Sequence, residues 1–227
     1  MPAEPGAFRR WWWPAVAAAV ATVLADLTGL DLAVARRLYD VEAHAWRWGE
    51  SWWANALVHD GGRWLVAAVF LGSLGVLAAA LVRRRRQQAL VAGYVALGIL
   101  FTTGLVALGK HWSHIACPGA WAGFGGHLPV TGLLDTRRVA LPGGGCFPGG
   151  HSSGAFALLT LYFPLYRRSA RRARMVLAGV LTLGMVFALG QWVRGAHVPS
   201  HDLASLAVAW IVCGGLWEWG LCRWVRN

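Results

Sequence analysis

Long apolar stretches dominate the chain and constrain its fold more than any other feature. Each is close to the roughly 20 apolar residues that a helix needs to cross the hydrocarbon core of a bilayer. Of the 227 residues, 57% are hydrophobic and only 14% are charged, whereas a soluble domain has about a quarter of its residues charged. This composition excludes a water-soluble globular domain and a disordered low-complexity chain. The predicted spans are roughly 12–30, 61–82, 88–109, 149–166, 175–193 and 203–222.

These stretches predict an all-α, polytopic membrane protein with six transmembrane helices. The 15 tryptophans agree, because their rings favour the boundary between lipid and water. The first stretch is interpreted as a retained anchor rather than a signal peptide, since its apolar part is long and no clear small-residue cleavage site follows. No internal repeat and no flexible linker interrupts the chain, so we expect a single membrane-embedded domain over 1–227.

The distribution of basic residues predicts the orientation of the chain. Its net charge is +11, but the basic residues lie between apolar blocks rather than on one face, which argues against a nucleic-acid partner. Basic residues near span ends stay on the cytoplasmic side, and 13 of the 21 fall in alternate connections. Both termini are therefore expected in the cytoplasm. The 13 residues are Arg9, Arg10, Arg83, Arg84, Arg85, Arg86, Arg167, Arg168, Arg171, Arg172, Arg174, Arg223 and Arg226.

The longer connections are then external, which in a bacterium means that they face the periplasm from the inner membrane. They cover about 31–60, 110–148 and 194–202. The first of them mixes tryptophans with charged residues, a pattern typical of one or two interfacial amphipathic helices.

Three polar segments at this external face are not explained by membrane insertion. Segment 110–118 begins with Lys110, the one lysine among 21 basic residues, although a lysine at a span end also serves as a snorkelling anchor. Segment 146–154 places glycines and two serines at the start of a span, where free N–H groups and hydroxyls favour an anion such as phosphate. Segment 191–202 brings one arginine, two histidines and one aspartate close to the membrane, where ionisable groups are usually functional.

Two chemistries are consistent with these groups. In the first, Lys110 and Arg194 hold a phosphate while one histidine attacks phosphorus and another protonates the leaving oxygen. In the second, the segments bind a metal, since His111, His114 and Cys117 recur every three residues and His197 and His201 are four apart. Carboxylates are scarce, however, and the two cations would repel a divalent ion, so phosphoryl transfer is favoured.

Taken in order, the three segments resemble the type-2 phosphatidic acid phosphatase superfamily, six-span enzymes that remove phosphate from lipids without a metal. The first motif of that family is Lys, six residues and Arg-Pro, and here Lys110 is followed by six residues and Cys117-Pro118. The second, Pro-Ser-Gly-His, is matched by Pro148-Gly149-Gly150-His151. The third is Arg, five residues, His, three residues and Asp, with a turn matched by His197-Val198-Pro199-Ser200.

This resemblance implies a role for each matched residue. His197 would be the nucleophile that forms a phosphohistidine, and His151 the general acid. It also implies a reaction without cofactor or metal, with a phosphorylated membrane lipid in the bilayer as the partner. The candidate substrates are phosphatidylglycerol phosphate, phosphatidic acid, a polyprenyl pyrophosphate and a lipid A phosphate. The phosphate would be bound by Lys110 and by the amides and hydroxyls around Gly150, Ser152 and Ser153.

Three positions depart from the family's motifs. Cys117 and Gln191 stand where the family has arginines, and His201 stands where it has an aspartate. Arg194 is predicted to replace the second arginine, because positions 191, 194 and 197 fall on nearly one face in helical geometry.

Two arrangements are open for holding the nucleophile. Either His201 accepts a hydrogen bond from His197 while Asp202 braces it, or the turn shifts so that Asp202 reaches His197 directly.

Cys117 and Cys146 are predicted to form a disulfide. They flank the loop between the first two motifs, in a compartment where disulfides persist. The alternatives to a lipid phosphatase are a lipid-to-lipid phosphotransferase, a metal-dependent membrane enzyme, and a non-catalytic lipid-binding or transport protein. The sequence leaves open which lipid is used, which molecule accepts the phosphate, and the oligomeric state.

Overall fold

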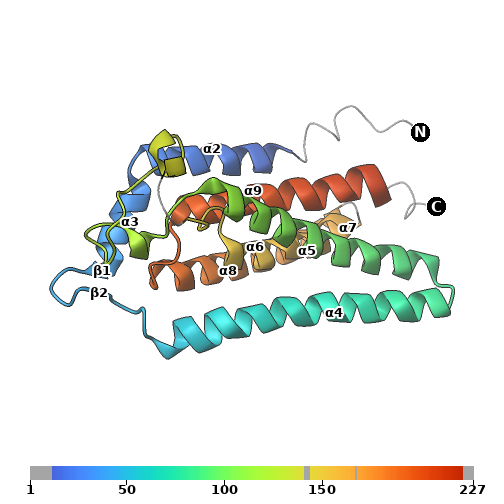
Figure 1. Cartoon of the computed structure of the whole chain (residues 1–227). Coiled ribbons are helices and arrows are strands. Elements are labelled where there is room, and N and C mark those ends of the chain that lie inside the picture. The colour runs from blue at the N-terminus through green and yellow to red at the C-terminus, as the bar shows by residue number, and fades with distance from the viewer. Residues whose placement is uncertain (1–11, 141–143, 167, 222–227) are drawn as a thin grey trace.

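The chain folds into an elongated bundle of helices, seen in a computed structural model that describes residues 12–140, 144–166 and 168–221 (Figure 1). Five of the six predicted spans coincide with single long helices. Within the described residues, four helical stretches are long and apolar enough to cross a membrane, and a bent pair gives a fifth. The fold is therefore the predicted all-α membrane class. The helices at five of the six predicted spans are α2 (Trp13–Leu27), α4 (Gly61–Val82), α5 (Arg86–Ser113), α8 (Ala170–Trp192) and α9 (Pro199–Gly215), the last extended by η5 (Leu216–Leu221).

The predicted span at 149–166 is broken into three pieces. These are α6 (Gly150–Phe156), the 3-10 turn η4 (Ala157–Leu161) and α7 (Phe163–Tyr166). Pro164 lacks an N–H group and cannot continue the α-helical hydrogen bonding, which accounts for the interruption near its position. Every residue from Ser152 to Thr160 is buried, so this segment forms the centre of the bundle rather than a lipid-facing helix.

The segment at about 31–60, for which one or two interfacial helices are expected, contains more than helices. The bend after α2, at Gly29 with a φ of +74°, turns the chain by 67° into the short helix α3 (Leu30–Leu38). A two-stranded hairpin of β1 (Tyr39–Asp40) and β2 (Ala45–Trp46) follows, which the sequence analysis did not predict. The π-helical stretch η1 (Trp53–Asp60) then runs directly into α4, and the two form one continuous helical stretch over Trp53–Val82.

The core forms where α5, α8 and α9 surround α6 and η4. Phe156, Leu159 and Trp210 lie in one buried cluster there. Close approach depends on glycine at two positions: a Cβ on Gly184 would lie 2.0 Å from the Phe156 ring, and a Cβ on Gly98 would lie 2.2 Å from the Thr160 methyl group. In contrast, α4 packs on α5 at the side of the bundle and leaves most of its surface open to lipid.

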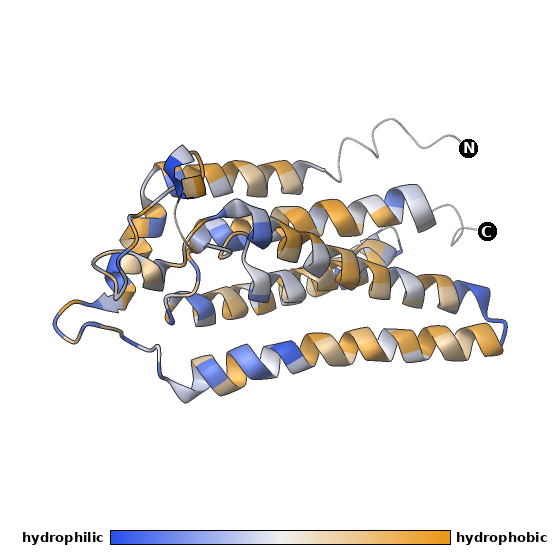
Figure 2. Ribbon diagram, in the orientation of Figure 1, coloured by the Kyte–Doolittle hydropathy of each residue, from blue (hydrophilic) through white to orange (hydrophobic). Residues whose placement is uncertain are grey.

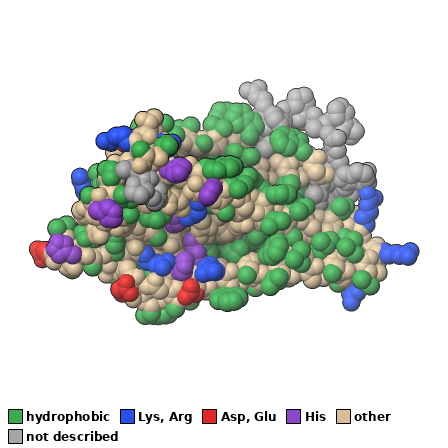
Figure 3. All heavy atoms as spheres, in the orientation of Figure 1, with side chains coloured by type: hydrophobic (Ala, Val, Ile, Leu, Met, Phe, Trp, Pro, Cys, Tyr) green, Lys and Arg blue, Asp and Glu red, His purple; other side chains and the backbone are tan. Residues whose placement is uncertain are grey.

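Hydrophobic and hydrophilic residues are distributed unevenly along the length of the bundle. Figure 2 shows mainly hydrophobic helices in the middle and hydrophilic residues at the α4–α5 connection and around the start of α4. Figure 3 shows histidine and cationic side chains gathered at the end that carries α3 and the start of α4, with further cations at the opposite end. The basic connection Arg83–Arg86 between α4 and α5 lies at that opposite end, and α2 runs from the middle of the bundle toward α3 (Figure 1). Five of the arginines from which the orientation is predicted lie outside the described residues, as does Cys222. They are Arg9, Arg10, Arg167, Arg223 and Arg226.

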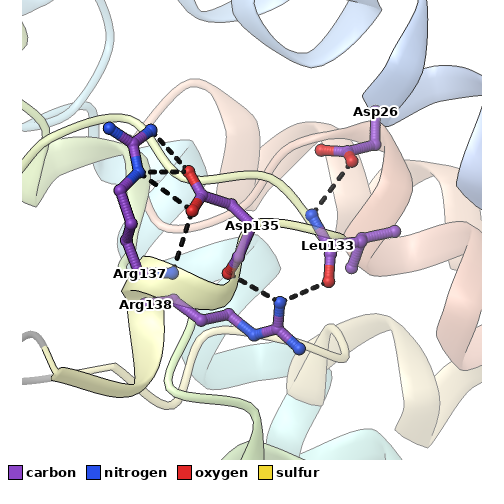
Figure 4. A network of polar contacts seen from close by, with 5 residues as sticks. All are labelled: Asp26, Leu133, Asp135, Arg137 and Arg138. Atoms are coloured by element: carbon purple, nitrogen blue, oxygen red, sulfur yellow. Dashed lines mark hydrogen bonds and ion pairs between the residues drawn. The ribbon is translucent and has the colours of Figure 1, made fainter.

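The long loop before α6 is held to the bundle by polar contacts (Figure 4). Asp26 of α2 accepts a hydrogen bond from the Leu133 N–H at 2.9 Å. Arg138 donates to the carbonyls of Leu133 and Asp135, and the Asp135 carboxylate pairs with Arg137. Asp26, a carboxylate inside a predicted span, therefore anchors this loop.

The predicted disulfide between Cys117 and Cys146 is confirmed. Their Cα atoms lie 5.1 Å apart, and the bond closes the loop between α5 and α6. This bond fixes the end of α5 close to the start of α6.

Loss of this disulfide is expected to destabilise the protein measurably. The two cysteines are 29 residues apart, and the chain-entropy model gives roughly 3 to 4 kcal/mol for a loop of that size. In detergent, the double variant Cys117→Ser/Cys146→Ser should melt roughly 10 °C below the wild type. Reductant should lower the melting temperature of the wild type but not that of the variant. Equal melting temperatures without reductant would contradict this expectation.

Candidate active site

The second and third polar segments meet at the first turns of α6 and α9. The Gly149 N–H donates to the His201 carbonyl at 2.8 Å, and the Ser205 hydroxyl donates to the Gly149 carbonyl at 2.7 Å. A side chain at position 149 has no room, because a Cβ would lie 2.3 Å from the Asp202 carboxylate. Glycine is thus required where the chain enters α6.

His197 lies in the turn between α8 and α9. Gly195, with a φ of +68°, ends α8, and the N–H groups of Gly195 and Ala196 donate back to the Trp192 and Gln191 carbonyls. This pattern is a Schellman motif, in which glycine adopts the left-handed conformation that closes a helix. Since α8 ends at Trp192, the expectation that positions 191, 194 and 197 share a helical face is wrong.

The start of α9 is held from the first external segment. The carboxylate of Asp31, on α3, accepts a hydrogen bond from the Ser200 N–H at 2.9 Å. Both residues are buried. Asp31 thus satisfies one of the free N–H groups in the first turn of α9, next to His201.

His201 is the partner that the structure places against His197. Their Nδ1 atoms lie 3.2 Å apart, and both side chains are buried. Burial, together with the nearby His201 and Lys110, lowers the pKa of His197 well below its usual value. His197 is therefore neutral at physiological pH and keeps a nitrogen lone pair.

Asp202 points away from the histidine pair. Its Oδ1 atom accepts from the Ser152 hydroxyl at 2.5 Å, and its Oδ2 atom accepts from the Trp192 indole N–H at 2.6 Å. Of the two arrangements considered above, the geometry agrees with contact through His201, whereas the bracing partners of Asp202 are Ser152 and Trp192. Asp202 therefore links α9 to α6 and α8.

Lys110, in the last turn of α5, lies over the start of α6. A Cβ built on Gly150 would lie 2.8 Å from the Lys110 Cε and 3.4 Å from its Nζ. The hydroxyl of Ser153 donates to the Gly150 carbonyl at 2.6 Å, just as that of Ser152 donates to Asp202. The structure thus brings Lys110 and Gly150 together, while both serine hydroxyl protons are already used within the protein.

His151 lies in a cluster that includes a residue the sequence analysis missed. Its ring stacks on His59 of η1 with centroids 4.8 Å apart, and its Nε2 atom lies 3.0 Å from the Val58 carbonyl oxygen. Gln191 contacts both His59 and Arg194 through its side-chain amide, each at 3.2 Å. No motif spacing marks His59 in the sequence, because it precedes His151 by 92 positions and stands in a different helix.

Two open cavities border these residues. One, of about 420 Å³, is lined by Lys110, His111, His114 and two glycines of the disulfide loop. The other, of about 330 Å³, starts at Gly150 and His151 and follows the apolar sides of α4 and α5. Cys117 is in the disulfide and is not available as a metal ligand beside His111 and His114. Within the described residues, no three His, Cys, Asp or Glu side chains come together as a metal site.

The lowered pKa of His197 makes the protein less stable in acid. The unfolded chain titrates near pH 6.5 at this position, so below that pH the unfolded state binds more protons and the free energy of unfolding falls. We expect His197→Asn to flatten this dependence between pH 6.5 and 5, by up to about 1.4 kcal/mol per pH unit. Melting temperatures in detergent measure the effect, with His127→Asn, an exposed histidine, as the control. A pH slope unchanged in His197→Asn would contradict the assignment.

Comparison with known families agrees with the motifs and the helical bundle. The family model of the PAP2 superfamily matches residues 92–224, which include all three polar segments and more than half of the chain. The comparisons with curated proteins and with solved structures gave no match. The family match supports phosphatase activity on phosphorylated substrates in general, and the apolar helices fit a multi-pass membrane protein. The chain therefore belongs to the PAP2 superfamily.

Proposed function

We propose that the protein hydrolyses a phosphate monoester or pyrophosphate on a membrane lipid, through a phosphohistidine and without a metal. The observation that carries this proposal is the buried contact of 3.2 Å between His197 and His201. A neutral histidine whose second nitrogen is held by a fixed partner is suited to nucleophilic attack. Lys110 supplies a positive charge close enough to act on His197.

In the first step, the His197 Nδ1–H donates to His201 Nδ1, which leaves the Nε2 lone pair free to attack phosphorus. The P–N bond forms as the bond from phosphorus to the leaving oxygen breaks, and His151, which enters this step as the cation with a second proton on Nδ1, gives that proton to the leaving oxygen. In the second step, His151 takes a proton from water as the water oxygen attacks phosphorus. The P–N bond then breaks, which releases phosphate and restores neutral His197.

The substrate tail is assigned to the cavity along α4 and α5. Beyond His151 and Gly150, its wall is formed by apolar side chains that include Val66, Phe70 and Ile99. A lipid chain in this cavity places its head group at the histidines. The proposal therefore includes a lipid rather than a water-soluble phosphate ester, with phosphatidylglycerol phosphate, phosphatidic acid, polyprenyl pyrophosphate and lipid A phosphates as candidates.

Phosphate release from these four lipids by detergent-purified protein tests the proposal. We expect release with at least one lipid, unaffected by chelator, and a loss of about 10³-fold or more in His197→Ala. The control His127→Ala should retain wild-type release. Chelator-sensitive release, or full activity of His197→Ala, would contradict the mechanism. Transfer of the phosphate to a second lipid instead of water would identify a phosphotransferase.

We further propose that the active site faces outward from a bacterial inner membrane, with both termini in the cytoplasm. The connection Arg83–Arg86 lies at the end of the bundle opposite the histidines, which supports this orientation under the rule for basic residues. A reporter that is active only in the periplasm should be active when inserted at His127 and inactive when fused to either terminus. The reverse pattern would overturn the orientation.

A further inference from the structure

A directed chain of hydrogen bonds fixes the protonation of His59. The Arg194 Nη1 donates to the Gln191 Oε1 at 3.2 Å, so the other end of the amide, Nε2, is a donor. This Nε2 lies 3.2 Å from the His59 Nδ1, which must accept. The remaining proton of the neutral His59 ring is therefore on its Nε2 atom. Among the hydrogen bonds of the described residues, none occupies this N–H group.

The neighbouring ring of His151 has the complementary polarity. Its Nε2 atom lies 3.0 Å from the carbonyl oxygen of Val58, and a carbonyl can only accept. The proton of a neutral His151 is thus on Nε2, and the lone pair is on Nδ1. The stacked pair, inclined by 28°, offers one N–H donor from His59 and one basic nitrogen from His151.

The surroundings of this pair favour an anion. The charges of Arg63 and Arg194 act on both rings, whereas an opposing charge, that of Asp60, acts on His59. His59 is half-buried, and its side chain stands on the π-helical stretch η1, a type of distortion that is frequent at functional sites. The same stretch supplies the Val58 carbonyl that orients His151.

We propose that His59 is a substrate-contacting residue whose Nε2–H binds a phosphate oxygen beside His151, and that Gln191 is a positioning residue that holds His59 in this tautomer. The inference rests on the proposed function, because the anion is the phosphate of the lipid or the inorganic phosphate formed from it. Arg194 acts through Gln191: it donates to the side-chain oxygen and so orients the amide toward His59.

Two substitutions of His59 test the contribution of its N–H group separately from that of its aromatic ring. His59→Phe keeps an aromatic ring to stack on His151 but loses the donor, whereas His59→Gln keeps an N–H donor at a similar reach. Removal of one preorganised donor to a phosphoryl oxygen typically lowers the rate by about 10²- to 10³-fold. We expect kcat/KM to fall by about 10²-fold in His59→Phe and by much less in His59→Gln. The melting temperatures of both variants should remain close to that of the wild type.

Gln191→Glu tests the positioning role. Glutamate can pair with Arg194 but cannot donate to the His59 Nδ1 atom, so the tautomer of His59 is no longer fixed. The loss in Gln191→Glu should resemble that of His59→Phe. The double variant His59→Phe/Gln191→Glu should lose little more than either single variant. Losses that multiply would show that Gln191 does not act through His59.

Inorganic phosphate serves as a probe that is independent of the lipid. Its affinity, measured by phosphorus NMR line broadening, should fall about tenfold or more in His59→Phe and stay unchanged in the control His127→Phe. Wild-type kcat/KM and phosphate affinity in His59→Phe would overturn this inference while leaving the proposed function intact. A wild-type protein that releases phosphate from no lipid would instead refute the proposed function, and phosphate binding would still decide the role of His59.

Discussion

The geometry of the site depends on the hydrogen bonds that the buried Asp202 carboxylate accepts. It accepts hydrogen bonds from Ser152 on α6 and Trp192 on α8, while it belongs to the first turn of α9. A carboxylate in a low-dielectric interior must be fully paired, so these partners cannot move independently. Because Gly149 passes within contact distance of this carboxylate, the entry into α6 is fixed as well. The positions of His197 and His151 follow from this junction.

A second constraint comes from His201, which lies beside His197, the proposed nucleophile. A carboxylate next to His197 would stabilise a positively charged ring, whereas the neutral His201 can only share a proton with it. In the proposed mechanism, the positive charge formed during attack is then balanced by the bound phosphate itself. The positive charges of Lys110, near His197, and of Arg63 and Arg194, near His151, favour such an anion. The substrate of the proposed reaction thus supplies the negative charge that is missing beside His197.

The spans, the disulfide and the residues of the three segments could be predicted from the sequence, because apolar length, loop position and local motifs are properties of neighbouring residues. The break in the segment at 149–166 was not predicted, since its interior is apolar on all sides and hydropathy does not distinguish a buried helix from a lipid-facing one. His59 was missed for a different reason. It reaches His151 only through the packing of η1 against α6 and α8, which no spacing along the chain reveals.

The hydrogen bond from the Ser200 N–H to Asp31 shows that the site depends on residues outside the matched family region. The match to the PAP2 superfamily begins at residue 92, but Asp31, Val58 and His59 all precede it. The N-terminal third of the chain is thus not a detachable membrane anchor, because it caps α9, the helix after His197, and contacts the ring of His151. A fragment limited to the matched residues would keep His151, His197 and His201. It would lose the Val58 carbonyl that contacts His151 and the Asp31 carboxylate that holds the first turn of α9, next to His201.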